Sequence, residues 1–314
     1  MFSKRQINFF LQKVPCFGWL YSGFVKLNLI LFHWNERCHQ VCYGKDDPDK
    51  RYYIVRSRGK TEGLLSSVFG VLWEIGWAKQ NGYIPYVDFS NSLCQYHVDR
   101  LVNGTDNAWE YFFLQPSNIT LREIKTKKNV LVGGWKLFEN KNAGLCISNE
   151  HLCFQPYVMA IADDYFDTNF KDKKVLGVFI RGTDYISLRP KGHSVQPTIE
   201  AMQEKIAEYV QKYNFDKIYV VTEDYDYYKT LTSAFGNKIC SFGDSFVKNY
   251  KGCDYVSEAF DDDPYERGLN YLLRILILSK CDYTICSKAS GSRFAKMIRE
   301  KEPIDEYWFE LGVY

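Results

Sequence analysis

Residues 174–180 read Lys174-Val175-Leu176-Gly177-Val178-Phe179-Ile180, an apolar run of the length of one strand. A strand without alternation between apolar and polar residues is covered on both faces, as in a parallel sheet flanked by helices. The polar residues Arg181-Gly182-Thr183-Asp184 follow at once, so the strand ends where a loop begins. The stretch therefore predicts a buried strand in the parallel sheet of an α/β domain.

Segments of helix length and of strand length alternate after this run. The pattern predicts helices over 197–213, 225–235, 266–279 and 290–299, and strands over 217–221, 238–240 and 283–286. Strands that alternate with helices pair in parallel, because each helix returns the chain to the same end of the sheet. The second half of the chain is thus expected to form one Rossmann-like domain.

The first half shows a looser version of the same alternation. It predicts strands over 51–56, 83–88 and 129–132, with helices over 64–81, 107–113 and 149–165. Two such assemblies in 314 residues predict an α/β fold in which two Rossmann-like domains face each other across a cleft. The expected ranges are 1–45 for an N-terminal amphipathic segment, 46–165 for the first domain and 166–314 for the second.

The N-terminal segment contains an apolar run over 17–32 that is shorter than the ~20 residues needed to span a bilayer. A narrow polar stripe interrupts it at Gly18, Ser22 and Lys26. Two interpretations remain open: a helix lying in a membrane interface with nearby basic residues on lipid head groups, or a helix packed on the protein or on a second subunit. No cleavable signal peptide precedes the ten cysteines, which indicates a cytoplasmic protein with reduced thiols. Peripheral association of residues 1–35 with the inner membrane face is the alternative.

The composition argues against several classes of function. The 40 Lys and Arg residues nearly balance 38 Asp and Glu residues, so the chain is not expected to bind duplex nucleic acid. Neither a Gly-x-Gly-x-x-Gly turn nor a P-loop follows a predicted strand, which disfavours dehydrogenases and P-loop kinases. The 24 Tyr, 22 Phe and 7 Trp residues either fill cores and interfaces or line a sugar site.

Polar residues follow three strands of the second domain, where ligands of parallel sheets bind. Arg181 and Gly182 follow the first, and they suit a bidentate contact to phosphate and a close backbone approach. Glu223 and Asp224 follow the second as acceptors for a ribose hydroxyl or a guanine N–H. The segment 287–293 follows the third and opens a helix, whose free N–H groups and hydroxyls form an anion site.

Each of these groups also has a plain structural interpretation. Arg181 and Asp184 could form an ordinary ion pair at the end of a strand. Glu223 and Asp224 could lie in a solvated turn, and Ser290 could be an N-cap. Their convergence at one edge of one sheet favours a nucleotide diphosphate site.

Four segments of the chain resemble the superfamily of GDP-fucose glycosyltransferases. Residues 178–184 (Val-Phe-Ile-Arg-Gly-Thr-Asp) resemble its His-x-Arg-x-(Thr)-Asp signature, and residues 281–290 (Cys-Asp-Tyr-Thr-Ile-Cys-Ser-Lys-Ala-Ser) resemble its second motif. Residues 222–224 take the place of its Ala-Thr-Asp-Asp segment, and residues 63–70 are similar, though less closely, to its N-terminal Gly-x-x-Asn-Gln-Leu-Phe loop. Residues 107–116 are similar to bacterial relatives encoded with surface-polysaccharide genes. The resemblance covers 51–314 and is more specific in the second half.

The resemblance implies a GT-B transferase, inverting and metal-independent, that moves fucose from GDP-fucose to a glycan or polysaccharide. The first domain would then bind the acceptor and the second the nucleotide sugar, and no cofactor would be needed. Arg181 would hold the β-phosphate with Gly182 and Thr183, and Asp184 is the best-placed base. Contacts from the helix-opening segment would come from Ser290, Ser292 and Arg293, and nucleoside contacts from Glu223 or Asp224. Gly63 and His193 are further candidates for substrate contact, although His193 could equally cap a helix.

The chain departs from the family pattern at two positions. Phe179 stands where the family has a histidine, which weakens the case for a guanine contact there. Arg189 stands where the core α1,6 enzymes have a proposed catalytic Glu.

Other functions remain alternatives. The same fold could use another nucleotide sugar, or it could be an inactive module that binds glycan or acts as a scaffold. Asp224-Tyr225-Asp226 is an Asp-x-Asp triplet, which would suit a metal-dependent GT-A transferase.

Overall fold

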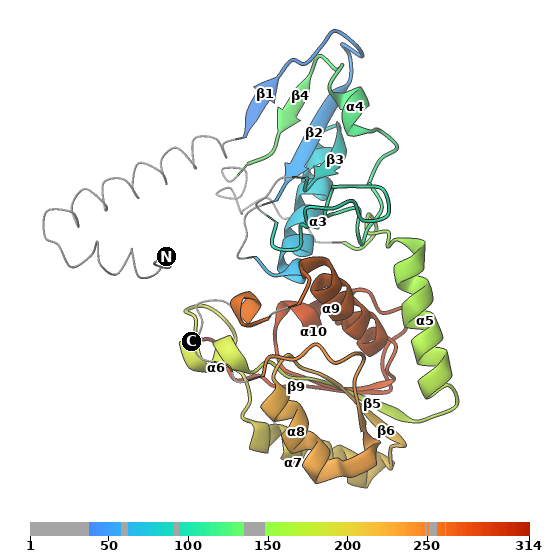
Figure 1. Ribbon diagram of the computed structural model, residues 1–314, viewed down its shortest axis with the longest axis vertical. Coiled ribbons are helices and arrows are strands. Elements are labelled where there is room, and N and C mark those ends of the chain that lie inside the picture. The colour runs from blue at the N-terminus through green and yellow to red at the C-terminus, as the bar shows by residue number, and fades with distance from the viewer. Residues whose placement is uncertain are drawn as a thin grey trace, which may run out of the picture. The chain divides into compact units, whose positions relative to one another are not determined.

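The computed structural model describes residues 38–57, 62–90, 94–134, 148–248, 250, 256–260 and 262–314 (Figure 1). These residues belong to two compact units. The first contains the described residues of the ranges Met1–Arg56, Ala78–Tyr86 and Ile119–Leu145, and the second those of Ser57–Trp77, Val87–Asn118 and Cys146–Tyr314. The units divide the chain differently from the ranges 46–165 and 166–314, because the chain enters the second unit twice before residue 146.

The first unit is built on a four-stranded sheet with the strand order β1-β4-β2-β3. Its strands are β1 (His39–Val41), β2 (Arg51–Arg56), β3 (Tyr83–Asp88) and β4 (Val130–Val132). Strand β4 pairs in parallel with β2 and antiparallel with β1. The short helix α4 (Leu121–Ile124) precedes β4. The helix α3 (Leu64–Gln80) connects β2 to β3 in the chain, but most of it belongs to the second unit. Buried residues on these elements, among them Tyr52 and Val130, form a small core.

The second unit is built on a five-stranded parallel sheet with the order β7-β6-β5-β8-β9. Its strands are β5 (Val175–Phe179), β6 (Lys217–Val221), β7 (Ile239–Cys240), β8 (Tyr283–Cys286) and β9 (Asp305–Trp308). Numbered along the chain, the strands have the order 3-2-1-4-5 of a Rossmann sheet. All strands remain parallel, but the order in which the chain adds them reverses between β5 and β8. Strand β5 is fully buried, as the apolar run at 175–179 predicts.

Helices cover both faces of the larger sheet (Figure 1). The helices α7 (Ile199–Tyr213) and α8 (Tyr225–Phe235) lie on one face, and α9 (Pro264–Ser279) and α10 (Ser290–Met297) lie on the other. The helix α5 (Pro156–Phe170) packs along α9. Met202, Ile206 and Leu231 are fully buried against the strands. Gly177 lets α9 approach β5, because a Cβ there would lie 2.7 Å from Leu278 Cδ1.

The α/β architecture with two sheets confirms the predicted fold class, whereas several element boundaries differ. The helix predicted over 149–165 begins later, at Pro156, and the one predicted from Pro197 begins at Ile199 after the N-cap Thr198. Residues 107–113 form turns rather than a helix, because Trp109 and Phe113 turn inward into an aromatic cluster with Phe154.

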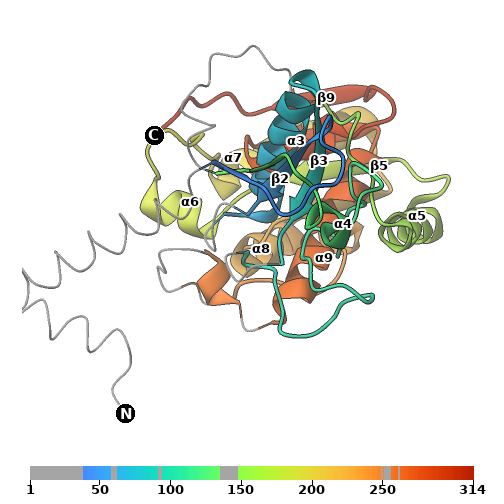
Figure 2. The ribbon, with the colours of Figure 1, turned by 90° about the horizontal axis from the view of Figure 1, so that it is seen from above.

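Among the described residues, four α-helices and strands lie where none was predicted, and α4 and β9 are two of them. The short helix α6 (Thr183–Leu188) follows β5, and β1 lies inside the range assigned to the N-terminal segment. Val41 of β1 packs against the small core, which explains why this strand belongs to the sheet. The C-terminus lies beside α6 (Figures 1 and 2), where the Gly192 N–H donates to the Tyr314 carbonyl at 3.1 Å.

The predictions for residues 1–35 lie outside the described residues. Among the helices that are described, none combines the length and the hydropathy that crossing a membrane requires.

Candidate active site

Three loops of the second unit meet at the carboxyl edge of its sheet, beside the reversal between β5 and β8. The ladder continues past the strand ends: the Ile180 N–H donates to the Val221 carbonyl at 3.1 Å, and the Ser287 N–H donates to the Phe179 carbonyl at 2.9 Å. The loops that carry Arg181, Glu223 and Ser287 therefore start side by side. In parallel sheets of this order, the reversal point is where ligands bind.

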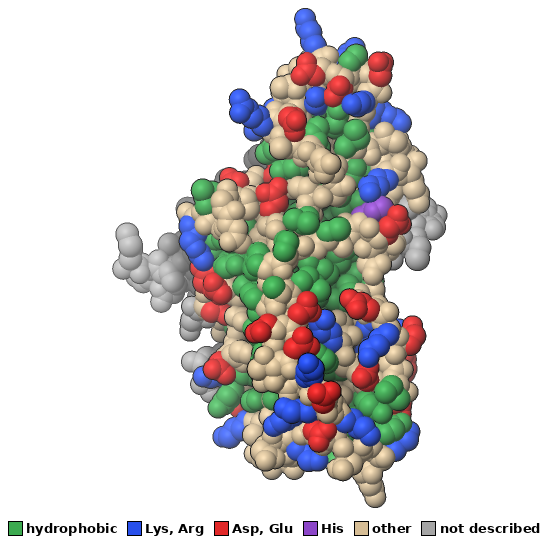
Figure 3. Space-filling view, turned by 90° about the vertical axis from the view of Figure 1, so that its right-hand side faces the viewer, with side chains coloured by type: hydrophobic (Ala, Val, Ile, Leu, Met, Phe, Trp, Pro, Cys, Tyr) green, Lys and Arg blue, Asp and Glu red, His purple; other side chains and the backbone are tan. Residues whose placement is uncertain are grey.

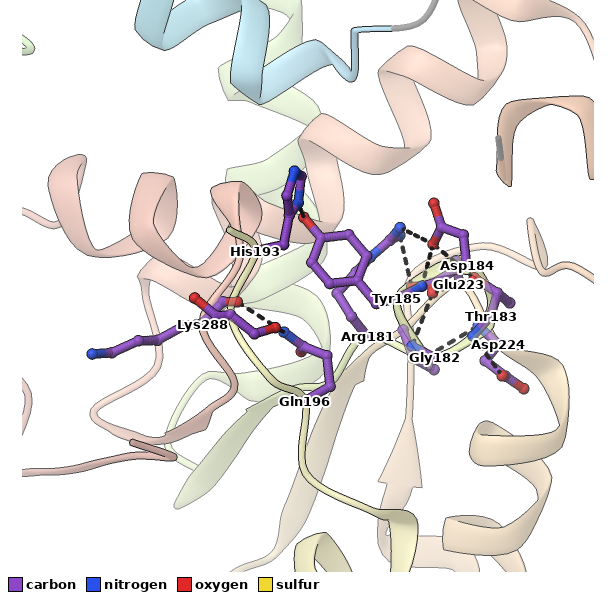
Figure 4. Close-up of polar contacts among 12 residues, drawn as sticks. Arg181, Gly182, Thr183, Asp184, Tyr185, His193, Gln196, Glu223, Asp224 and Lys288 are labelled. Atoms are coloured by element: carbon purple, nitrogen blue, oxygen red, sulfur yellow. Dashed lines mark hydrogen bonds and ion pairs between the residues drawn. The ribbon is translucent and has the colours of Figure 1, made fainter. Parts of the chain in front are cut away.

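Arg181 lies in the middle of this edge between two carboxylates (Figure 4). Its Nη2 donates to Asp184 Oδ1 at 2.7 Å, and its Nη1 lies 3.0 Å from Glu223 Oε2. The guanidinium also lies over the Tyr185 ring, 4.9 Å from its centroid. The side chain is 15% exposed. Burial lowers the pKa of Arg181, but Glu223 and Asp184 outweigh it, and the net pKa is raised above the ordinary arginine value.

Glu223 and Asp224 both turn toward the Arg181 loop. Glu223 Oε1 accepts hydrogen bonds from the Gly182 N–H and the Thr183 hydroxyl, each at 2.9 Å. Asp224 Oδ2 accepts from the Thr183 N–H at 3.3 Å, and its Oδ1 accepts from two N–H groups at the start of α8, for which it is the N-cap. All four carboxylate oxygens are thus engaged, so a nucleoside contact by either residue would have to replace a contact present here.

The backbone at the start of α6 is unusual. Thr183 is a buried β-branched residue with φ +41°, a conformation that such residues rarely adopt. Position 182 requires a glycine, because the Asp224 side chain packs against it and a Cβ there would lie 2.4 Å from Asp224 Oδ2. The sequence predicted that this glycine admits a ligand, whereas here it admits the Asp224 side chain.

Tyr185 covers one side of Arg181 and links it to His193. His193 Nδ1 lies 3.2 Å from the Tyr185 hydroxyl, and the two rings meet edge to face (Figure 4). Burial raises the pKa of Tyr185, although the Arg181 charge opposes this. His193 is exposed on a loop and caps no helix, since α7 is capped by Thr198. The role of Tyr185 was not predicted; the one signal in the sequence is an aromatic residue four positions after Arg181.

The helix α10 begins beside these loops, and its three predicted contact residues behave differently. The Ser292 hydroxyl is buried; it donates to the Ser287 carbonyl at 2.6 Å and accepts from the Ala289 N–H at 3.1 Å, so it caps the helix. Ser290 is the first helical residue rather than the N-cap, and its hydroxyl bonds to no described residue. Arg293 is exposed and forms no ion pair within the described part of the chain, and its charge acts on Tyr185.

Gly63 precedes a residue that contacts Tyr96. The Leu64 N–H donates to the buried Tyr96 hydroxyl at 3.0 Å. Burial raises the pKa of Tyr96 to about 12, and the charges of Arg267 and Arg181 act against that rise. Gly63 itself is exposed, with open space where a side chain would be.

Phe179, at the position of the family histidine, points into the protein. A Cβ on Gly291 would lie 2.7 Å from Phe179 Cε2 and 2.4 Å from the Tyr271 hydroxyl. The ring therefore supports the first turn of α10 instead of facing a ligand.

The described residues contain no group of three His, Cys, Asp or Glu side chains that could hold a metal ion. The Asp-x-Asp triplet has a structural use, because Asp224 caps α8 and Asp226 is an exposed residue of its first turn. The structure thus brings Arg181, Asp184, Glu223 and Asp224 into one contacting cluster, and Ser292 into the cap of α10.

Comparison with known proteins gives structural likenesses alone. No family model matches the chain, and no curated protein matches it in sequence. A NodZ α-1,6-fucosyltransferase soaked with GDP-fucose aligns with 79% of this chain and 92% of its own, at 13% identity and a TM-score of 0.49. NodZ from Bradyrhizobium gives 13% identity, the same coverage and a TM-score of 0.46. POFUT1 in complex with GDP aligns over 84% of this chain and 99% of its own, at 11% identity and a TM-score of 0.48.

Proposed function

We propose that this chain is an inverting glycosyltransferase of the GT-B type. It transfers a sugar, fucose from GDP-fucose, to a hydroxyl of a glycan or polysaccharide, without a metal ion and in the cytoplasm. The sequence motifs at 178–184 and 281–290 support this proposal, because they include the carboxyl ends of β5 and β8, the two strands that flank the reversal of the larger sheet.

One observation carries the proposal: Arg181 lies at the reversal point of a Rossmann sheet, and its contacts with the described residues leave some of its N–H groups for a ligand. A guanidinium has five N–H groups. Its contacts with Asp184 and Glu223 use two of them at most, which leaves at least three. An arginine held in one orientation, with N–H groups to spare, suits a bidentate contact to the β-phosphate of a nucleotide diphosphate.

The start of α10 supports the same ligand. The first N–H groups of a helix have no partners in a preceding turn, and the helix dipole favours an anion there. The Ser290 hydroxyl and the exposed Arg293 add a donor and a positive charge on that side. These groups offset the negative charge that Asp184, Glu223 and Asp224 bring to the loop.

The residues also suggest how the reaction proceeds. As the acceptor oxygen attacks the anomeric carbon, the bond to the diphosphate breaks and negative charge grows on the leaving group. Arg181 and the α10 N–H groups stabilise that charge. Asp184 takes the acceptor proton, since its Oδ1 faces Arg181 while its Oδ2 points away from the guanidinium (Figure 4).

The first test substitutes Arg181. We expect Arg181→Ala to lower kcat by roughly 10²–10³, as for other preorganised donors to developing charge. Removing the guanidinium also leaves two half-buried carboxylates unpaired, so Arg181→Ala should lose stability as well. Arg181→Lys keeps the charge but loses the planar fork, and we expect it to fold and still lose most of its turnover. Turnover near wild type in a folded Arg181→Lys or Arg181→Ala variant would contradict the assignment.

The second test is a thermal-shift screen of GDP, UDP, dTDP and CMP. A ligand that binds the folded state raises the Tm in proportion to its affinity and concentration, so the preferred base shows directly. A preference for GDP supports the proposal. A preference for another nucleotide would keep the fold and change the donor, and failure to bind any of the four would indicate an inactive binding module.

A further inference from the structure

Glu223 contacts the loop that carries Arg181 through both of its carboxylate oxygens. Its Oε1 accepts from the Gly182 N–H and the Thr183 hydroxyl, and its Oε2 lies 3.0 Å from Arg181 Nη1. The side chain is 11% exposed. One carboxylate therefore holds both the backbone and the side chain of the segment that carries Arg181 (Figure 4).

These contacts restrict the backbone of residues 181–183 and the side-chain rotamers of Arg181. Residues 181–183 leave the end of a strand through a strained turn, in which Thr183 has φ +41°. A long arginine side chain also loses much rotamer entropy when it is held in one orientation. Glu223 holds the turn through Gly182 and Thr183, and it holds the guanidinium through its charge.

Asp184 does not duplicate this function. It belongs to the same segment as Arg181, so the pair at 2.7 Å can move as one body. Glu223 comes from the loop after the neighbouring strand β6, and it ties the segment to that strand end.

We infer that Glu223 is a positioning residue for Arg181 and not a ligand of the nucleoside. It orients the guanidinium toward the β-phosphate before the donor arrives. The inference rests on the proposed function, since it takes a nucleotide diphosphate as the ligand of Arg181.

The test is a double-mutant cycle measured with GDP and GMP. Glu223→Gln keeps a carbonyl oxygen for Gly182 and Thr183, but it places an N–H₂ group toward Arg181 and removes the ion pair. Affinities of GDP and GMP are measured by calorimetry for wild type, Glu223→Gln, Arg181→Lys and the double variant. Asp226→Asn is the matched control, because Asp226 is an exposed carboxylate three residues further on in α8.

We expect Glu223→Gln to weaken GDP binding by about ten-fold, a loss typical of broken charge-assisted contacts, and to leave GMP binding unchanged. The same substitution should have little further effect on GDP when Arg181 is already Lys, because Glu223 acts through Arg181. Asp226→Asn should bind both nucleotides like wild type. In turnover assays, kcat should fall in Glu223→Gln even at saturating donor.

Three results would overturn the inference. Equal losses for GDP and GMP that add to the effect of Arg181→Lys would show a direct nucleoside contact. Unchanged GDP binding in Glu223→Gln would show that the ion pair does not orient Arg181. If wild type binds neither GDP nor GMP, the proposed function fails and the inference with it. Glu223→Ala, compared by thermal unfolding, identifies any loss that comes from misfolding alone.

Discussion

Gly182 shows how a single residue can shape the site without touching a ligand. Asp224 occupies the space that a side chain at position 182 would need. A Cβ added there would lie 2.4 Å from Asp224 Oδ2 and 2.8 Å from Asp224 Cβ. Asp224 cannot move away freely, because it caps α8. Two carboxylates therefore hold the turn that carries Arg181: Asp224, which fits against Gly182, and Glu223.

We expect Gly182→Ala to lower the free energy of unfolding by about 1–3 kcal/mol, as overpacking typically does. The added methyl group should push Asp224 out of its contacts with Thr183 or with the start of α8. The control is Gly63→Ala, where a Cβ meets nothing within 4 Å and which should change stability by less than about 0.5 kcal/mol. Chemical denaturation measures both. Equal stabilities for the two variants would show that Asp224 has room to relax.

At the scale of elements, α10 divides its polar residues between structure and ligand. The Ser292 hydroxyl bonds to Ser287 and Ala289 and holds the first turn closed. Ser290 lies one residue into the helix, and its hydroxyl has no bond with the described residues. The two serines, two residues apart, therefore serve as controls for each other.

We expect Ser292→Ala to lower the free energy of unfolding by about 1–2 kcal/mol, because it removes a cap and leaves a buried N–H without a partner. Ser290→Ala should leave stability within about 0.5 kcal/mol of wild type and weaken GDP binding by roughly ten-fold, the value of one hydrogen bond to a charged group. Denaturation and calorimetry on both variants separate the two roles. If Ser290→Ala binds GDP like wild type, the hydroxyl is not a phosphate ligand.

Asp305 joins β9 to α7. It accepts from the Tyr209 hydroxyl at 2.9 Å and from the Tyr213 hydroxyl, and it lies 3.1 Å from Lys212 Nζ. These partners, Tyr213 foremost, hold the pKa of Asp305 below its ordinary value, although burial acts in the opposite direction. The carboxylate form is therefore favoured in the folded state.

This depressed pKa makes stability depend on pH. The contribution of Asp305 is fully present above the pKa of an unfolded Asp, about 3.9, and is lost as pH falls through the lower folded value. We expect Asp305→Asn to lower the free energy of unfolding by about 1–3 kcal/mol at pH 7. The difference in this free energy between the variant and wild type should become smaller as pH falls from about 5 to 2. Asp167→Asn, an exposed residue of α5, is the control. A difference that stays constant with pH would show that the effect comes from packing, not charge.

At the scale of the whole molecule, basic and acidic residues are nearly equal in number. On the face shown in Figure 3, described Lys and Arg side chains are interspersed with Asp and Glu side chains. This agrees with the near balance of 40 basic and 38 acidic residues. A cluster of charged side chains in contact lies instead at the edge of the larger sheet, where Arg181 pairs with Asp184 and Glu223.

The proposed reaction should not depend on a divalent cation. We expect turnover to stay within about two-fold of its value when excess EDTA is added, because Arg181 and the start of α10 supply the positive charge that the leaving diphosphate needs. Assays with EDTA, and with Mg²⁺ or Mn²⁺ restored, measure this. A loss in EDTA that Mn²⁺ reverses would contradict the proposal and favour a metal-dependent transferase.

The sequence alone determined the central features of the larger sheet. The apolar run at 174–180 predicted a buried parallel strand, and polar residues after three strands predicted the edge where the site lies. Periodicity and strand length carry this information locally, so it can be read without knowing which strands are neighbours. The start of α5 and the turns at 107–113 escaped prediction, because aromatic packing with distant residues decides them.

The tertiary structure alone decided what each polar residue of the site contacts. Arg181, Glu223 and Asp224 were recognisable as a group, but only the pairing of β5 with β6 places the Glu223 carboxylate on Arg181 and the Asp224 carboxylate against Gly182. The same holds for Ser292, which caps α10, while Ser290 remains without a partner among the described residues. A hydrogen bond depends on distances between atoms that lie far apart in the chain, and these distances follow from the order of the strands rather than from any local pattern.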